Sequence, residues 1–556
     1  MQIQFIGPLG KVTGSCAWMR DVDRGWSFLI DCGLQQGESS AERWNSGECW
    51  PFDPKTLQFM VLTHAHADHC GLIPLLYKAG FNGTVFCTTE TREIAKIALQ
   101  DGVRFAGGAY DTRDVSRIKW HTPGHETAFG GYHPVDDDIF IRFFRSGHIL
   151  GAASVTVVWG APGREQRSIA FSGDIGPGTE DQEVLPFLRF RQKPAPATYS
   201  VLESTYGDVV RREEVKSPEV RRERLRGVFD HIVNHGSTAA ICAFAIGRTQ
   251  DVLFDCHQVV AENPEKYGAI DFYLDSPSGQ EINEVTRIAL SAQQTIATSG
   301  KVRFKWLGKQ VFRVLGLDDR NRDDIDAAVS IADMTFSNRA RQVSDAGTPV
   351  IGRGNTIARD WRPLFTAVTD RRKMINEDSS TPRVVLMSSG MCDGGPAAEW
   401  LPVLSRYEHN VIAPSGYCGR GTIGGELLTL ANCSLEQRAL RLDTITWTNQ
   451  GEEVAKVPVS EIRARVMKLE GYSAHGDQID LVNWQFPITK TGEQGQTSPC
   501  VFLQHGENRQ RRTLAKALKA RSNELDLSLE VITPSDPSVW YDLEGSGAGS
   551  GWAIRA

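Results

Sequence analysis

Residues 61–72 read Val-Leu-Thr-His-Ala-His-Ala-Asp-His-Cys-Gly-Leu, and the rest of the chain is interpreted from this stretch. It places three of the thirteen histidines, His64, His66 and His69, within six residues, together with Asp68. The apolar run before them is typical of a buried strand, and the Gly-Leu-Ile-Pro-Leu-Leu segment after them is typical of the start of a helix. A strand-to-helix turn therefore presents four polar side chains, a density of imidazole that neither a core nor a surface requires.

The spacing of these side chains predicts two metal positions rather than one. Alternation along the turn directs His64 and His66 the same way, whereas Asp68 and His69 lie at the mouth of the helix and can face a second position. Imidazole and carboxylate groups are the ligands of catalytic zinc, and manganese or iron also accepts them. The alternative is a histidine-rich loop with ordinary hydrogen bonds, which the spacing and the flanking segments disfavour.

Length and composition limit the class of protein. A chain of 556 residues exceeds one ordinary core, so two or more domains are expected. No apolar run is long enough to span a bilayer and the chain opens on a strand pattern rather than a signal peptide, so we expect a cytoplasmic protein with no membrane partner. The net charge of -7 argues against an overall basic surface but permits a local basic groove for nucleic acid.

Further candidate ligands follow predicted strands. His148 comes after an apolar run and a glycine that frees the backbone to turn inward, and Asp174 ends the strand predicted for 168–172. A carboxylate in that place can bridge two cations held about 3.5 to 4 Å apart. Glu203 lies at the end of the next strand, where a carboxylate can cap the helix that follows. His121 and His125 form a competing pair, which we interpret as surface loop residues.

From about residue 209 the pattern changes to strands that alternate with helices. A run of mixed charge at 211–226 indicates an exposed helix, and the expected strands that follow are 238–245, 271–274, 383–387 and 410–413. Strands separated by helical stretches predict a parallel doubly wound sheet, in which ligands bind at the carboxyl ends of the strands.

One loop at those carboxyl ends predicts a phosphate site. Ser388, Ser389 and Gly390 open a run of small residues before a helix, where backbone N–H groups are free to bind an anion. Arg248 and Arg420 are the basic side chains best placed to accompany it. A purely structural tight turn remains an equal alternative.

The pattern His-x-His-x-Asp-His after a buried strand resembles the signature of the metallo-β-lactamase superfamily, and 63–76 resembles its β-CASP nucleases. Two late motifs, Gly-Tyr-Ser-Ala-His475-Gly-Asp and Val-Phe-Leu-Gln-His505-Gly-Glu, resemble the remaining motifs of that group. The resemblance implies an α/β fold in which a metallo-β-lactamase αββα sandwich contains an inserted β-CASP domain with a doubly wound parallel sheet. The implied segments are 1–208 and 469–540 for the sandwich and 209–468 for the insert. The Gly- and Ser-rich composition of the end predicts a flexible tail at 541–556.

Carried over residue by residue, the resemblance also implies a site with two Zn²⁺, or Mn²⁺ or Fe²⁺ in their place. The implied metal ligands are His64, His66, Asp68, His69, His148, Asp174 and His505. One metal would take His64, His66 and His148, the other Asp68, His69 and His505, and Asp174 would be shared. Asp68 and His475 would act in catalysis, His475 as the acid with Glu203 as its partner, and Asp31 would lie near the metals.

The function implied is that of a metal-dependent ribonuclease in RNA processing or decay, acting on single-stranded RNA as an endonuclease, a 5′-3′ exonuclease or both. A DNA nuclease of the Artemis type is the first alternative, and there His505 favours RNA because that branch usually has an apolar residue in its place. A small-molecule metallo-hydrolase would not need a second domain of this size. A non-catalytic scaffold would be expected to have lost ligands. The sequence leaves a homodimer open, and 300–380 is longer than is usual in the family.

Overall fold

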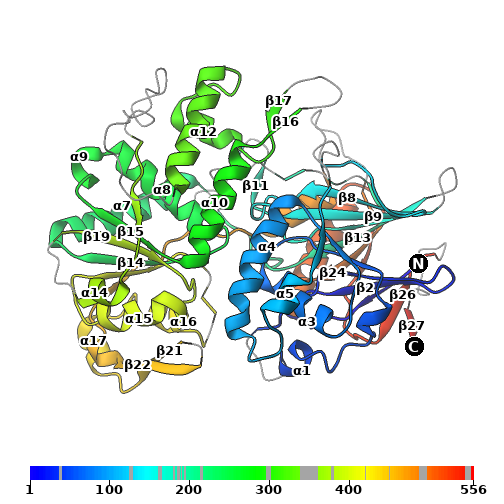
Figure 1. Ribbon diagram of the computed structural model, residues 1–556, viewed down its shortest axis with the longest axis horizontal. Coiled ribbons are helices and arrows are strands. Elements are labelled where there is room, and N and C mark those ends of the chain that lie inside the picture. The colour runs from blue at the N-terminus through cyan, green and yellow to red at the C-terminus, as the bar shows by residue number, and fades with distance from the viewer. Residues whose placement is uncertain are drawn as a thin grey trace.

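The structure is a computed structural model of the chain, drawn in Figure 1. It describes residues 1–36, 41–123, 129–160, 166–179, 182–183, 188, 191–192, 194, 196–212, 217–295, 302–337, 361–376, 381–416, 418–419, 421–449, 451–487, 497–544 and 553–555. Two lobes lie side by side, and the lobe that carries both chain ends is built from the first and last parts of the chain.

The first lobe contains an eight-stranded sheet in the order β27-β26-β1-β2-β3-β4-β5-β6. Its strands are β1 (Gln2–Phe5), β2 (Ala17–Asp21), β3 (Trp26–Ile30), β4 (Phe59–Val61), β5 (Thr84–Phe86), β6 (Lys119–His121), β26 (Val539–Asp542) and β27 (Ala553–Arg555). The strand β4 predicted before the histidines is therefore an interior strand, and its carboxyl end delivers the turn that holds them.

A second, seven-stranded sheet has the order β25-β24-β13-β10-β9-β8-β7. Its strands are β7 (His133–Asp136), β8 (Ile139–Arg145), β9 (Ala153–Trp159), β10 (Arg167–Phe171), β13 (Tyr199–Glu203), β24 (Cys500–Gln504) and β25 (Glu530–Ile532). The parallel neighbours β10, β13 and β24 bring Asp174, Glu203 and His505 to one edge, although His505 is about three hundred residues away in sequence.

The two sheets face each other across an apolar core, with helices on their outer faces. Phe5 of the first sheet contacts Phe502 of the second, their ring centroids 5.3 Å apart. Outside the first sheet lie α2 (Ala67–Cys70), α3 (Ile73–Lys78), α4 (Thr89–Gly102) and α5 (Thr112–Ser116). Outside the second lie α18 (Gln478–Gln485) and α19 (Asn508–Glu524). This arrangement confirms the αββα sandwich.

The second lobe is built on a six-stranded parallel sheet in the order β18-β15-β19-β14-β20-β23. Its strands are β14 (Thr238–Cys242), β15 (Asp271–Asp275), β18 (Phe365–Ala367), β19 (Arg383–Met387), β20 (Val411–Pro414) and β23 (Arg465–Val466). The four predicted strands are present, and all pairings in the sheet are parallel. The short edge strands β18 and β23 were not predicted.

Helices cover both faces of this sheet, which confirms the doubly wound insert. One face packs against α7 (Pro218–His235), α8 (Arg248–Glu262), α10 (Pro277–Ser291), α11 (Lys309–Leu315) and α12 (Arg322–Phe336). The other packs against α15 (Gly395–Leu404), α16 (Ile423–Thr429), α17 (Leu435–Ala439) and the hairpin of β21 (Thr444–Asn449) and β22 (Glu452–Pro458).

The remaining elements are short: α1 (Ala41–Asn45), η1 (Pro54–Thr56), η2 (Val103–Phe105), β11 (Gly178–Thr179), β12 (Gln182–Glu183), α9 (Pro264–Tyr267), β16 (Gln293–Thr295), β17 (Val302–Phe304), α14 (Arg371–Asn376) and η3 (Val459–Glu461). Within the described residues, no helix combines the length and the apolarity that crossing a bilayer requires.

Two predictions about segments need correction, and a third is described in part. The helix expected at 211–226 begins at Pro218, because Ser217 caps it, and it is not wholly exposed, since Arg221 is buried against Asp255. The expected tail at 541–556 includes residues of β26 and β27, which pair with each other beside β1. In the long segment 300–380, the described elements are β17, α11, α12, β18 and α14, and 338–360 lie outside the described residues.

Candidate metal centre

The histidine turn is fixed by close backbone contacts beneath it. A Cβ on Gly33 would lie 1.6 Å from the carbonyl oxygen of Asp68, so only glycine allows the loop after β3 to pass there. Cys70 is buried in α2 and donates its thiol to the carbonyl oxygen of Ala65 at 3.4 Å. Cys70 therefore acts as a small packing residue under the turn.

Two other loops aim their side chains at this turn through left-handed backbone conformations. Gly147, with a φ of 78°, precedes His148, and Gly173, with a φ of 55°, precedes Asp174. His505 itself has a φ of 50° directly after β24. A histidine with positive φ is uncommon and signals a local constraint.

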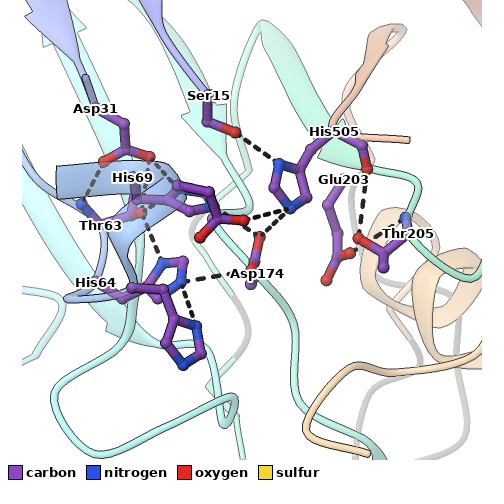
Figure 2. Close-up of polar contacts among 12 residues, drawn as sticks. Ser15, Asp31, Thr63, His64, His69, Asp174, Glu203, Thr205 and His505 are labelled. Carbon is purple, nitrogen blue, oxygen red and sulfur yellow. Dashed lines mark hydrogen bonds and ion pairs between the residues drawn. The ribbon is translucent and has the colours of Figure 1, made fainter. Parts of the chain in front are cut away.

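Asp174 lies at the middle of the resulting cluster, as Figure 2 shows. Its Oδ2 lies 3.4 Å from His64 Nε2 and 3.5 Å from His148 Nε2. Its Oδ1 lies 3.3 Å from His69 Nε2 and 3.5 Å from His505 Nε2. Each carboxylate oxygen therefore faces a different pair of histidines.

The remaining predicted ligands complete the two groups. His66 Nδ1 lies 3.1 Å from both His64 Nε2 and His148 Nε2, on the Oδ2 side of Asp174. Asp68 Oδ2 lies 3.9 Å from His505 Nε2, on the Oδ1 side. The donor atoms of each group lie within 4.8 Å of one another, and the groups are His64, His66, His148 and Asp174 on one side and Asp68, His69 and His505 on the other.

This donor set fits two divalent cations. Asp174 Oδ1 and His69 Nε2 are buried without a hydrogen-bond partner, although buried polar atoms are nearly always satisfied. Three neutral imidazoles with a carboxylate oxygen are typical ligands of a zinc site with an open position. A cation on each side of Asp174 would satisfy these atoms.

The charges of the cluster agree with ligands that are ready to bind a cation. Burial lowers the pKa of His66 to about 4 and holds the pKa values of His64 and His148 well below 6.5, so these imidazoles are neutral at pH 7. Burial alone would raise the pKa of Asp174, but the histidines around it, His505 first, hold that pKa well below its usual range. Metal binding requires these neutral imidazoles and this ionised carboxylate.

Hydrogen bonds from outside the cluster orient its rings. The Nδ1 atom of His69 lies 2.8 Å from Asp31 Oδ2, and that of His505 lies 2.6 Å from the hydroxyl of Ser15. The Nδ1 atom of His148 lies 2.9 Å from the carbonyl oxygen of Ala474. Such partners fix the tautomer of a ligating histidine and leave its other nitrogen facing the metal.

His475 lies beside the cluster with a carboxylate behind it. Its Nε2 lies 3.9 Å from Asp174 Oδ2, and its Nδ1 lies 3.4 Å from Glu203 Oε2. Burial alone would lower the pKa of His475, but the carboxylates of Glu203, Asp174 and Asp68 together outweigh burial and raise that pKa above its usual value. Glu203 also accepts hydrogen bonds from the backbone N–H groups of Ile175 at 2.5 Å and Thr205 at 3.4 Å, and residues 204–212 after it form turns rather than a helix.

Comparison with known proteins identifies the chain. A model of the metallo-β-lactamase superfamily matches residues 9–214, a β-CASP domain model matches 249–427, and a model described as a Zn-dependent metallo-hydrolase RNA specificity domain matches 460–534. The chain belongs to the β-CASP ribonuclease family of the metallo-β-lactamase superfamily.

Two relatives are similar to the chain over most of its length. It is 27% identical to "Ribonuclease TTHA0252" of Thermus thermophilus, over 95% of this chain and 98% of that protein. It is 25% identical to "Transcription termination factor FttA" of Methanocaldococcus jannaschii, over 91% of this chain and 67% of that protein.

The competing histidines lie elsewhere in this β-CASP protein. His121 ends the edge strand β6, is exposed, and packs its ring on Phe86 with the centroids 5.0 Å apart. His125 lies outside the described residues. The structure thus brings His148, and not His121, to the cluster.

The predicted phosphate loop follows β19 in the β-CASP lobe. Ser388 and Ser389 are partly exposed, Gly390 is buried, and the hydroxyl of Ser389 donates to Asp393 Oδ1 at 3.0 Å. The hydroxyl of Ser389 thus already has an acidic partner within the loop. The role predicted for the loop therefore stays a prediction.

The two arginines predicted beside this loop differ. Arg248 opens α8 and is buried, with Nε and Nη1 lacking a hydrogen-bond partner. Burial lowers the pKa of Arg248 to about 10, which leaves the guanidinium charged at pH 7. Arg420 lies outside the described residues.

Reasoning from the sequence missed three groups near the centre. They are Ser15, Thr63 and Arg211, which contact His505, Asp31 and the loop of His475 respectively. Arg211 donates to the carbonyl oxygen of His475 at 3.0 Å and to the hydroxyl of Ser473 at 2.9 Å. Thr63 directly precedes His64, whereas nothing in the sequence analysis pointed to Ser15 or distinguished Arg211 from the charge run around it.

Proposed function

We propose that this protein hydrolyses phosphodiester bonds of single-stranded RNA with two divalent cations, most simply Zn²⁺, bound on either side of Asp174. The observation that carries the proposal is that the two oxygens of Asp174 face two separate groups of histidines. The names of the relatives, a ribonuclease and a transcription termination factor, and the RNA specificity model support RNA as the substrate.

The residues that would hold the cations follow from the two groups. His64, His66 and His148 would hold one cation, Asp68, His69 and His505 the other, and Asp174 would be shared. When bound, a pair of divalent cations lowers the pKa of a water molecule and neutralises charge that develops on the phosphoryl oxygens.

The protein's own contribution to bond cleavage is a proton held at the edge of the cluster. The pKa of His475 is raised above its usual value, so its imidazole holds a proton to higher pH than an ordinary histidine does. We infer that its Nε2, which faces Asp174, donates this proton to the leaving oxygen, while Glu203 orients the ring and supports its charge. Arg211 holds the backbone of the same loop in place.

A digest of single-stranded RNA and DNA of one sequence tests this function. Each strand is labelled at either end and incubated with the purified protein, with and without a chelator. The proposal expects cleavage of RNA that the chelator abolishes and added Zn²⁺ or Mn²⁺ restores, and the two labels separate internal cuts from removal of 5′ nucleotides. Preferential cleavage of DNA would favour the Artemis-type alternative, and cleavage of neither strand would refute a nuclease.

A further inference from the structure

A row of basic residues lies on the surface, on helix α19 of the sandwich lobe. Residues 508–523 contain six basic residues and no acidic one, in a chain whose net charge is -7. Arg511 is buried and Arg521 pairs with Glu524, which leaves Arg509, Arg512, Lys516 and Lys519 exposed.

The four exposed cations share one face of the helix. They follow the spacing i, i+3, i+7 and i+10, which aligns side chains in a stripe along a helix. At 1.5 Å per residue, the stripe spans about 15 Å. We call these four residues the α19 stripe.

The α19 stripe is largely free of compensating acids. Arg509 forms an ion pair with Asp208 at 3.0 Å, whereas Arg512, Lys516 and Lys519 form no ion pair within the part of the chain that the structure describes. Helix α7 shows the usual arrangement by contrast. Its Arg222 and Arg226 both pair with Glu219. Cations that repel one another along one face cost stability, so an unpaired stripe points to an external anion.

The stripe begins at the predicted active site. Helix α19 starts three residues after His505, and the carbonyl oxygen of His505 accepts a hydrogen bond from the hydroxyl of Thr205. Asp208, the partner of Arg509, belongs to the same short loop as Thr205. The amino-terminal end of the stripe therefore lies at the rim of the cluster, and its far end leads away from it.

We propose that the α19 stripe binds the phosphate backbone of single-stranded RNA outside the cleavage site. This inference rests on the proposed function and extends it to a substrate-binding surface. The occupant is RNA rather than an acidic protein, because the described residues of α19 include no exposed large apolar side chain of the kind that anchors a protein partner. A row of flexible cations is the expected footprint of a nucleic-acid backbone.

A triple variant tests the proposal in the intact, metal-loaded protein. It combines Arg512→Ala, Lys516→Ala and Lys519→Ala, and it keeps Arg509 because of its contact near the cluster. A matched control combines Lys309→Ala, Arg320→Ala and Arg322→Ala, which removes three exposed cations from the other lobe. Both variants are assayed on a long single-stranded RNA of about 30 nucleotides and on a short one of about six, from about 50 to 200 mM salt.

The proposal expects the α19 variant to show a KM for the long RNA about tenfold higher at low salt, with kcat unchanged. Each lost contact to a single strand should flatten the plot of log(kcat/KM) against log[salt] by about 0.7, so three contacts give a change of about 2. The short RNA and the control variant should show neither effect. A single Lys516→Ala variant, expected to give about a third of the slope change, guards against a folding defect in the triple variant.

Two outcomes have different meanings. If the wild-type protein cleaves RNA and the α19 variant has the same KM and salt dependence as the control, the stripe does not bind the substrate and this inference is wrong. If the wild-type protein cleaves no RNA, the proposed function itself fails.

Discussion

Asp174 Oδ1 and His69 Nε2 lie 3.3 Å apart, both buried and both without a hydrogen-bond partner. On the other side of its ring, His69 is held by Asp31, 2.8 Å from Nδ1. Burial alone would lower the pKa of His69, but the carboxylates of Asp174 and Asp31 outweigh it and hold that pKa well above 6.5. A cation bound between these two atoms would satisfy both, which explains why two carboxylates converge on one imidazole.

Asp31 should tune the affinity for metal without contacting it. We expect Asp31→Asn to weaken metal binding about 10- to 100-fold, because His69 loses the anion that orients its ring. Asparagine tolerates the left-handed backbone at this position, where φ is 58°, so the loop should keep its shape. Competition with a coloured chelator measures the affinity. Asp526→Asn, at an exposed residue with a φ of 52°, is the matched control, and an equal loss of metal in both variants would refute the role of Asp31.

His148 and His121 should differ sharply on substitution. His148 lies in the cluster, 3.5 Å from Asp174, whereas His121 lies exposed on an edge strand. We expect His148→Ala to abolish RNA cleavage and His121→Ala to retain nearly wild-type rates, as measured by initial rates on labelled RNA. Loss of activity in His121→Ala with activity kept in His148→Ala would show that the wrong third histidine motif was chosen.

His475 should matter for proton transfer and not for metal content. We expect His475→Ala to keep both cations and to bind RNA, while turnover falls by roughly 100- to 10,000-fold, the usual contribution of general acid catalysis. The turnover of Glu203→Gln should fall less, because this substitution removes only the partner of the acid. With a nitrophenyl phosphodiester, whose leaving group needs no proton, both variants should regain their turnover, whereas Asp174→Ala should not. Loss of metal in His475→Ala would place this histidine among the ligands.

The stability of the β-CASP lobe should fall in acid through His257. This buried histidine of α8 accepts a hydrogen bond from the backbone N–H of Leu364, and burial lowers its pKa to about 4. Since the unfolded pKa is near 6.5, the stabilisation is present above pH 6.5 and is lost as pH falls towards 4. The shift corresponds to about 3 kcal/mol.

The test compares urea unfolding of the wild-type protein and His257→Gln between pH 4.5 and 7. Trp361, whose ring stacks on His257 at 5.7 Å, supplies a local fluorescence signal. The wild-type protein should lose more stability across this range than the variant. Equal losses would show that His257 does not titrate as its burial requires.

Much of the fold could be predicted because its signals are local. The buried strand before the histidines and the strands of the insert are short apolar runs, and the alternation of strands with helices is enough to indicate a parallel sheet. The strands β26 and β27 could not be predicted, because neither is part of a longer apolar run. They owe their place to pairing, β26 with β1 and β27 with β26. Such long-range pairing leaves little trace in the local sequence.

The candidate site likewise contains residues that the local sequence predicts and residues that it does not. The density of imidazole within one turn is enough to predict four ligands, His64, His66, Asp68 and His69. Nothing in the local sequence connects them to Asp174 or His505. Only the resemblance to a family brought those residues together before the structure placed them within reach of one another. Backbone groups such as the carbonyl oxygen of Ala474, which orients His148, have no signature in the sequence at all.

The most direct test of the central claim is the number of cations bound per chain. Elemental analysis of an active preparation should find two transition-metal ions in the wild-type protein, because each oxygen of Asp174 faces its own group of ligands. Asp174→Ala should lose more metal than His505→Ala, since Asp174 serves both positions and His505 serves one. At most one metal ion per chain in a fully active wild-type protein would contradict the account.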